Sequence, residues 1–154
     1  MTSGAGCLPC ELEHSDDNAV VFRDETWSCE VAPGYEVPGW YILRVRRHAE
    51  GWEGLLPAEL AGFGSRCQLL SSAIKDALAA SHVYFMNFGE NYPHLHFLVT
   101  ARHADTPPDR RGGNILTLRE THRDMARALA VLPAMRVALA APTTPRTLDP
   151  TTAA

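Results

Sequence analysis

The chain has 154 residues, 45% of them hydrophobic, which is enough to form the core of one domain of ordinary size. Its 14 Lys and Arg against 18 Asp and Glu give a net charge of -4, so it lacks the overall positive field that attracts nucleic acid or anionic lipid. It shows no secretion-type leader and no run of about 18 apolar residues, and its four cysteines are too few for a disulfide scaffold. These features predict a cytoplasmic protein that binds neither nucleic acid nor a membrane.

The first third of the chain has the pattern of β-strands. Residues 19–23 (AVVFR) and 26–31 (TWSCEV) are rich in β-forming side chains and flank an acidic dipeptide, which is typical of a hairpin. Residues 32–39 (APGYEVPG) contain two Pro-Gly steps and are predicted to form a loop. Residues 40–46 (WYILRVR) alternate in polarity and are predicted to form a third strand.

A long amphipathic helix is predicted for residues 57–80, where apolar side chains recur every three or four positions and a proline occupies the first turn. Gly62 and Gly64 weaken this helix. Residues 82–88 (HVYFMNF) and 94–101 (HLHFLVTA) follow as two strands joined by a short turn. The centre of the chain is therefore one helix followed by a strand pair.

The last third is predicted to be mostly helical. A loop is expected at residues 105–114 and a helix at 116–132, which Pro133 stops or kinks, and residues 141–154 read as a disordered tail. Strands separated by one long helix predict an α+β fold, in which an antiparallel β-sheet packs with that helix and a further helix lies near the C-terminus. One domain is expected to span residues 1–140.

Two histidines stand one residue apart in NYPHLHFLV, residues 91–99. Because side chains alternate between the two faces of an extended strand, His94, His96 and Leu98 are expected on one face. Paired histidines in a strand are as typical of hydrogen-bonded structural residues as of a catalytic site. Other residues are needed to decide between these interpretations.

Cys7 and Cys10 form a Cys-x-x-Cys pair, CLPC. Two thiolates at this spacing can bind one zinc ion from a single turn and leave two tetrahedral positions for other ligands. A redox pair is the alternative, but it normally lies between a strand and a helix, a setting that this segment does not show. His48 closes one predicted strand and His94 opens another, so both can be presented rigidly to the cysteine pair.

Four segments in this order resemble the histidine triad superfamily: CLPC, the strand ending in RRH, LLPAEL at the start of the long helix, and PHLHFLVTAR. Members of that superfamily include nucleotide phosphoramidases, dinucleoside polyphosphate hydrolases and galactose-1-phosphate uridylyltransferase. The resemblance runs from about Cys7 to Arg102, and DRRGGNIL is similar to the segment that follows in many bacterial members, so it is strongest over residues 7–118. It implies an antiparallel sheet packed with a long helix and, by family analogy, a homodimer.

The resemblance also implies roles for individual residues. The His-x-His-x-His motif of the family falls on His94, His96 and Leu98, so His96 is the expected nucleophile and would form a covalent nucleotidyl-histidine. Asn87 matches a family asparagine near the phosphates, with a turn residue at the end of a strand as the alternative. Zinc-binding members use two cysteines and two histidines, in a closed site with a structural role. The zinc ligands implied here are Cys7, Cys10, His48 and His94.

The sequence departs from the family pattern where the substrate is expected to bind. Leu98 replaces the third histidine, which helps to hold the phosphate, and loss of one such donor commonly lowers the rate by about 10² to 10³. Ala32 stands where a carboxylate that binds the ribose hydroxyls is expected. In the shortened GENYP loop, Glu90 and Asn91 are candidate substrate contacts, with a solvated turn as the alternative.

Three hypotheses follow for the function. The first is a hydrolase or nucleotidyltransferase of the histidine triad type, which contains zinc and acts on a nucleotide or phosphate ester through His96. The second is an enzyme on the same scaffold that acts on a non-nucleotide small molecule, with His96 as acid or base and with Trp40, Tyr92 or Leu98 lining an altered pocket. The third is a non-catalytic binding protein. Ala32 and Leu98 favour the second and third hypotheses, and the retained His96 favours the first two. Solvated surface charges, or else phosphate contacts, are predicted for Arg44, Arg46, Arg47, Arg110 and Arg111.

Overall fold

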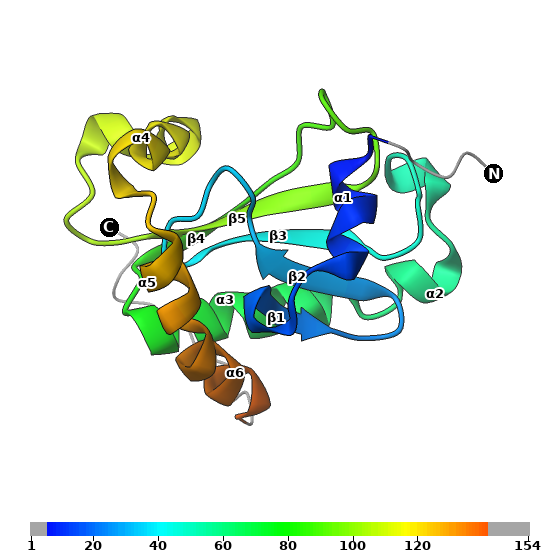
Figure 1. Ribbon diagram of the computed structural model, residues 1–154, viewed down its shortest axis with the longest axis horizontal. Coiled ribbons are helices and arrows are strands. Elements are labelled where there is room, and N and C mark those ends of the chain that lie inside the picture. Colours follow the sequence, from blue (N-terminus) through cyan, green and yellow to red (C-terminus); the bar gives the residue numbers. More distant parts are fainter. Residues whose placement is uncertain (1–5, 142–154) are drawn as a thin grey trace, which may run out of the picture.

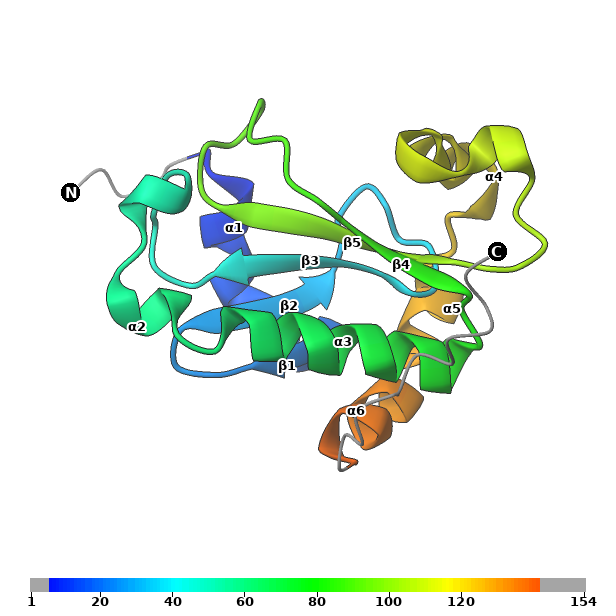
Figure 2. The same ribbon diagram turned by 180° about the vertical axis from the view of Figure 1, so that it is seen from behind.

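The structure is a computed structural model that describes residues 6–141. Its centre is an antiparallel sheet of five strands in the order β1-β2-β3-β5-β4. The strands are β1 (Val20–Arg23), β2 (Trp27–Val31), β3 (Trp40–Val45), β4 (His82–Met86) and β5 (His96–Arg102). The long helix α3 (Phe63–Leu78) lies along one face, and the short helix α1 (Leu8–Glu11) lies against the other (Figures 1 and 2). The predicted α+β fold is confirmed.

The predicted hairpin between β1 and β2 is present, and Asp24 explains its turn. One carboxylate oxygen of Asp24 accepts hydrogen bonds from the backbone amides of Thr26 and Trp27, each at 2.9 Å. The backbone amide of Asp24 donates to the carbonyl of Trp27, also at 2.9 Å. Aspartate favours such turns because its short side chain can bond the backbone two residues later.

The main core lies between the sheet and α3. Alternate residues of β2, β3 and β5, among them Cys29, Leu43 and Val99, are fully buried in one apolar cluster with Leu70 and Ile74 of α3. The intervening residues face the opposite side of the sheet, as strand geometry requires. That second face carries polar and charged side chains as well as apolar ones, and it is the face on which the candidate site is built.

The predicted helix at residues 57–80 is divided into α2 (Pro57–Leu60) and α3 (Phe63–Leu78). Gly62 separates them with a backbone φ of 75°, a left-handed conformation that glycine adopts without steric strain. The two strands that follow are shorter than predicted. β4 ends at Met86, and β5 begins at His96, because His94 forms only an isolated bridge with Glu50.

The prediction of one helix at residues 116–132 is wrong. The segment contains η5 (Gly112–Leu118), α4 (Arg119–His122) and α5 (Met125–Ala130), and α6 (Leu132–Ala140) follows. A new helix begins at α5 because the Asp124 carboxylate accepts a hydrogen bond from the Arg127 amide at 3.0 Å. Pro133 opens α6 instead of ending a helix, since the first turn does not require its missing N–H.

Five short 3-10 helices complete the fold within residues 6–141. They are η1 (Leu12–His14), η2 (Asp17–Ala19), η3 (Trp52–Gly54), η4 (Pro108–Arg110) and η5 (Gly112–Leu118). η4 and part of η5 occupy the predicted loop at residues 105–114. None of the helices within residues 6–141 is long and apolar enough to cross a membrane. The predicted tail, apart from Ala141, lies outside the described residues.

Candidate metal centre and active-site cleft

Four potential metal ligands converge at one end of the sheet. Cys7 and Cys10 belong to the turn into α1, His48 follows β3 and His94 precedes β5, and their ligand atoms all lie within 4.8 Å of one another. The Nδ1 atom of His94 is 3.5 Å from the Sγ atom of Cys7 and 3.3 Å from that of Cys10. The Nδ1 atom of His48 is 3.2 Å from the Sγ atom of Cys10. Two sulfurs and two imidazole nitrogens form the donor set of a closed, tetrahedral zinc site.

Local backbone structure explains why both cysteines face the histidines. Cys7 caps α1, and its carbonyl accepts hydrogen bonds from the backbone amides of Cys10 at 3.0 Å and Glu11 at 3.1 Å. This single turn brings Cys10 back beside Cys7. The sequence-based prediction that these two cysteines share one site with His48 and His94 therefore agrees with the geometry.

The ring orientations of the two histidines suit a metal ligand. The Nε2 atom of His94 is 2.7 Å from the carbonyl oxygen of Val45, so Nε2 carries the proton and the Nδ1 lone pair points at the sulfurs. Burial, together with the nearby His48, Arg44 and His96, lowers the pKa of His94 to about 4, despite the opposing effect of the hydrogen bond to Val45. The His94 ring is therefore neutral at neutral pH, which is the form that binds metals. Nε2 of His48 lies 3.3 Å from a carboxylate oxygen of Glu50.

His96 is the first residue of β5 and is half-buried. Its Nδ1 atom lies 2.6 Å from the carbonyl oxygen of His94. A carbonyl can only accept, so Nδ1 of His96 donates the proton of this hydrogen bond, and in the neutral ring the lone pair is on Nε2. The side-chain amide of Asn87 donates to the carbonyl of His96 at 2.7 Å. The sequence position expected to be the nucleophile is thus held in one tautomer by the backbone of a metal-ligand candidate.

His96 lines a cleft that encloses about 730 Å3, open solvent at its mouth included. The walls come from α1, the loop after β2, strands β3 and β5, η5 and the loop between β4 and β5, which stands above the sheet near α1 (Figures 1 and 2). The structure places three of the predicted substrate contacts in this lining: Glu90, Asn91 and Leu98. Asn87 is outside the lining, where its amide supports the backbone of β5.

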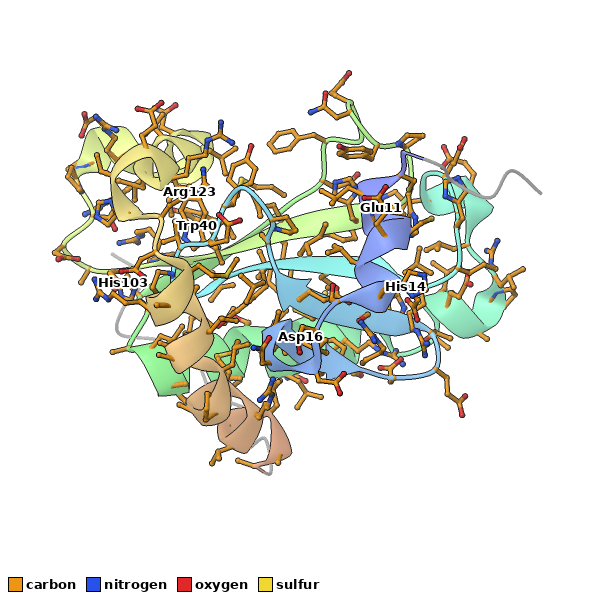
Figure 3. All side chains as sticks on the ribbon, in the orientation of Figure 1. Glu11, His14, Asp16, Trp40, His103 and Arg123 are labelled. Carbon is orange, nitrogen blue, oxygen red and sulfur yellow. The ribbon has the colours of Figure 1, made fainter. Side chains whose placement is uncertain are left out.

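Two of the three departures from the motif, Ala32 and Leu98, are neighbours in space. Leu98 packs against a small apolar cluster that contains Ala32, Ile42 and Leu12. Leu98, Ala32 and Ile42 line the cleft, and Leu12 does not. Tyr92, named in the altered-pocket hypothesis, also lines the cleft. Trp40 does not, because it is buried in a separate cluster, at the end of the sheet remote from Glu11 and His14 (Figure 3).

The prediction of a solvated Arg44 is wrong, because this side chain is fully buried and forms an ion pair with Glu13 of η1. Its guanidinium pairs with Glu30 at 2.7 Å and with Glu13 at 2.9 Å. Arg44 also lies directly across from His96 in the pairing of β3 with β5. Only its partners could have revealed the burial, since a buried charge requires a countercharge, and both partners are distant in sequence.

The other four basic side chains predicted to be solvated or phosphate-binding are held away from the cleft. Arg46 pairs with Glu13, and Arg47 pairs with Glu59 at 2.8 Å. Arg110 lies 3.9 Å from Asp109, and Arg111 donates to the carbonyl of Thr106 at 2.9 Å. Within the part of the chain that the structure describes, no lysine or arginine contributes to the cleft lining, and Glu90 is the one carboxylate there.

Comparison with solved structures identifies the class of fold. The chain is similar to a hypothetical histidine triad nucleotide-binding protein from Sulfolobus tokodaii, with a TM-score of 0.66 and 18% identity over 86% of this chain and 91% of that one. It is also similar to a zinc-bound histidine triad family protein from Mycobacterium smegmatis, with a TM-score of 0.61 and 19% identity over 88% of this chain and 94% of that one.

A uridylyltransferase matches with a TM-score of 0.60 and 16% identity over 86% of this chain and 45% of the other. No family model matches the sequence, and no curated protein does either. The α+β fold of this protein is therefore the histidine triad fold.

Proposed function

We propose that the protein is a hydrolase or nucleotidyltransferase that uses His96 as a nucleophile on a small, nucleotide-like phosphate compound. The observation that carries this proposal is the 2.6 Å contact between Nδ1 of His96 and the carbonyl oxygen of His94. It fixes the tautomer in which Nε2, on a ring that lines the cleft, has a free lone pair. The nucleotide-binding and uridylyltransferase descriptions of two structural neighbours support phosphate chemistry as the class of reaction.

The proposed reaction has two steps. In the first, the Nε2 lone pair of His96 forms a bond to phosphorus, the bond from phosphorus to the leaving group breaks, and the leaving group takes that electron pair and a proton from solvent. The proton on Nδ1 of His96 stays in place, so the positive charge of the phosphorylated imidazole faces the carbonyl dipole of His94. In the second step water or another acceptor attacks phosphorus and loses a proton, the bond from phosphorus to Nε2 breaks, and its electron pair returns to Nε2 of His96.

The four convergent donors, Cys7, Cys10, His48 and His94, fit zinc as the proposed metal. A closed site of this kind supplies structural cross-linking and no open coordination position. It would fix the backbone two residues before His96, and with it the carbonyl that orients the nucleophile. Leu8, which lies between the two cysteines, lines the cleft, so the same cross-link would hold one wall of the cleft in place.

The test is a search for the covalent intermediate. The protein is incubated with adenosine phosphoramidate, a dinucleoside polyphosphate or a nucleotide sugar, quenched, and weighed intact under denaturing conditions, while product release is followed in parallel. We expect a nucleotidyl adduct or turnover in the wild type that is lost in His96→Ala. His103→Ala is the matched control, because His103 is exposed and lies at the end of the molecule remote from α1 (Figure 3).

Zinc-loaded wild-type protein that gives neither adduct nor turnover with these compounds would contradict the proposal. The cleft would then serve a non-nucleotide substrate or a purely binding function. Turnover that persists in His96→Ala would contradict the assignment of the nucleophile in particular.

A further inference from the structure

The floor of the cleft is apolar. Ala32, Ile42 and Leu98 lie together there, and Leu12 packs behind them. Ile42 and Leu98 are directly paired across β3 and β5, so their side chains form one continuous surface beside His96. A polar group placed on this floor would lose its hydrogen bonds to water without gaining others.

Within residues 6–141, three aromatic side chains line the cleft. Tyr92 lies with its ring centroid 6.5 Å from that of His96, at a steep angle. Phe88 is 63% exposed, which is unusual for so large an apolar side chain, and it lies at the cleft together with Tyr35. Rings arranged in this way offer flat apolar surfaces to an aromatic group on a ligand.

The charges around the cleft do not favour a polyanion. Arg44, the basic residue paired across the sheet with His96, has no exposed surface, and its charge is balanced by Glu30 and Glu13. Arg119 is held 4.5 Å above the ring of Tyr35. At the cleft itself Glu90 adds a negative charge, and no cation within residues 6–141 lines the surface. Each additional phosphate on a ligand would therefore add negative charge to a cleft that already holds a carboxylate, and no basic side chain of the lining would pair with it.

We infer that the cleft takes substrates that combine one apolar or aromatic group with a single phosphoryl group, and that it selects against polyphosphates. This inference rests on the proposed function, because the phosphoryl group is placed at Nε2 of His96. The apolar group lies on the floor formed by Ala32, Ile42 and Leu98, between the aromatic rings. Adenosine monophosphate derivatives with a single phosphorus meet this description, whereas dinucleoside polyphosphates do not.

The number of phosphates can be varied while the aromatic group stays constant. Calorimetric titration of His96→Ala with adenosine, adenosine monophosphate and adenosine diphosphate measures binding without turnover. We expect the monophosphate to bind no more tightly than adenosine, and the diphosphate to bind about tenfold more weakly than the monophosphate, which corresponds to about 1.4 kcal/mol. A diphosphate that binds more tightly than the monophosphate would overturn the inference, and so would the absence of any binding by adenosine.

Two substitutions locate the effect in the cleft. Leu98→Gln keeps the size of the side chain but makes the floor polar, and it should weaken adenosine binding at least fivefold, whereas Leu60→Gln, at an exposed leucine of α2 outside the lining, should not. Glu90→Gln should reduce the preference for the monophosphate about threefold, and Glu25→Gln, at an exposed acid in the β1–β2 turn, should leave it unchanged. Equal effects in a variant and its control would contradict the assigned positions.

The outcomes separate this inference from the proposed function. A wild type that forms the His96 adduct but prefers polyphosphates keeps the function and refutes the substrate class. The expected order of affinities without any adduct or turnover keeps the character of the cleft and refutes the catalytic proposal.

Discussion

The metal-ligand cluster and the cleft share the segment around β5 but differ in what their residues offer. In the cluster, donors from three separate segments converge, and all four suit one zinc ion. In the cleft, two positions where a hydrogen-bonding or charged group is expected carry Ala32 and Leu98, which pack together. The carbonyl of His94 joins the two regions through its contact with His96. The four metal-ligand candidates, Cys7, Cys10, His48 and His94, are here called the frame. All four are present next to a changed binding surface, and the two regions should respond separately to substitution.

The largest effect should come from the nucleophile. His96→Ala removes the attacking nitrogen, so turnover should fall by at least about 10³-fold, as is common when a covalent nucleophile is lost. Zinc content and unfolding temperature should stay close to those of the wild type, because His96 is not among the four ligand candidates. Steady-state kinetics and metal analysis of the same preparation provide the measurement. A variant that loses zinc as well as activity would show that the two regions are not separable.

Removal of one metal ligand should affect the frame. Cys10→Ala should abolish stoichiometric zinc binding and reduce stability, by about 4 kcal/mol when free zinc is near a thousand times the dissociation constant of the wild type. Chemical denaturation of both proteins, with and without a chelator, measures this loss. The difference in stability between the wild type and Cys10→Ala should vanish once the chelator has removed zinc from the wild type. Cys67→Ala is the matched control, since Cys67 is also partly buried but lies on α3, outside the cluster. Equal zinc binding by Cys10→Ala and the wild type would contradict the assignment.

The buried ion pair between Arg44 and Glu30 should have a smaller effect on stability, and this effect should not depend on zinc. Arg44→Met leaves Glu30, which is also fully buried, with the partly exposed Arg23 as its remaining ion-pair partner, and should destabilise the protein by about 3 kcal/mol. Arg47→Met should cost less than about 1 kcal/mol, because the Arg47 side chain is 45% exposed. Urea unfolding of the two variants, each with a chelator present, makes the comparison. An Arg44→Met variant as stable as the wild type would show that the ion pairs of Arg44 with Glu30 and Glu13 do not stabilise the fold.

The smallest effect lies outside both regions and depends on pH. The Arg47 guanidinium and the Leu56 amide lower the pKa of Glu59, against the opposing effect of burial. Because the pKa is lower in the folded state, the stabilisation is present above the ordinary value of 4.5 and is lost as the pH falls through the folded value. Glu59→Gln should therefore cost about 1 kcal/mol at pH 7 and less at pH 3, as measured by urea unfolding at both values. A cost that does not fall with pH would contradict this account.

Local patterns predicted the features that depend on neighbouring residues. The Asp24 turn, the alternation along β3 and the Cys-x-x-Cys turn each rest on contacts within a few positions, and the structure contains all three. Strand positions suggested His48 and His94 as partners of the distant cysteines, and the resemblance assigned them as ligands. The sequence-based analysis did not anticipate that Arg44 is buried, because its partners lie 31 and 14 residues away, at Glu13 and Glu30.

The C-terminal helices were predicted less well for a related reason. Asp124 and Pro133 are compatible both with the interruption of one helix and with the start of another, and packing decides between these outcomes. Leu132 and Met135 are fully buried in the main core, which favours a separate helix α6 in that position. Similarly, the presence of Leu98 in the sequence showed that the motif is broken, but only the structure places it beside Ala32.

The separation of frame and cleft can be tested most directly by weighing three proteins, the wild type, His96→Ala and Cys10→Ala, after exposure to zinc and adenosine phosphoramidate. Native mass spectra count bound zinc, and denaturing spectra count covalent nucleotide. We predict one zinc per chain in the wild type and in His96→Ala, none in Cys10→Ala, and a nucleotidyl adduct that requires His96. Loss of zinc in His96→Ala, or one zinc retained in Cys10→Ala, would contradict the central claim. That claim is that a zinc-binding frame and a separate cleft with His96 meet at the start of β5.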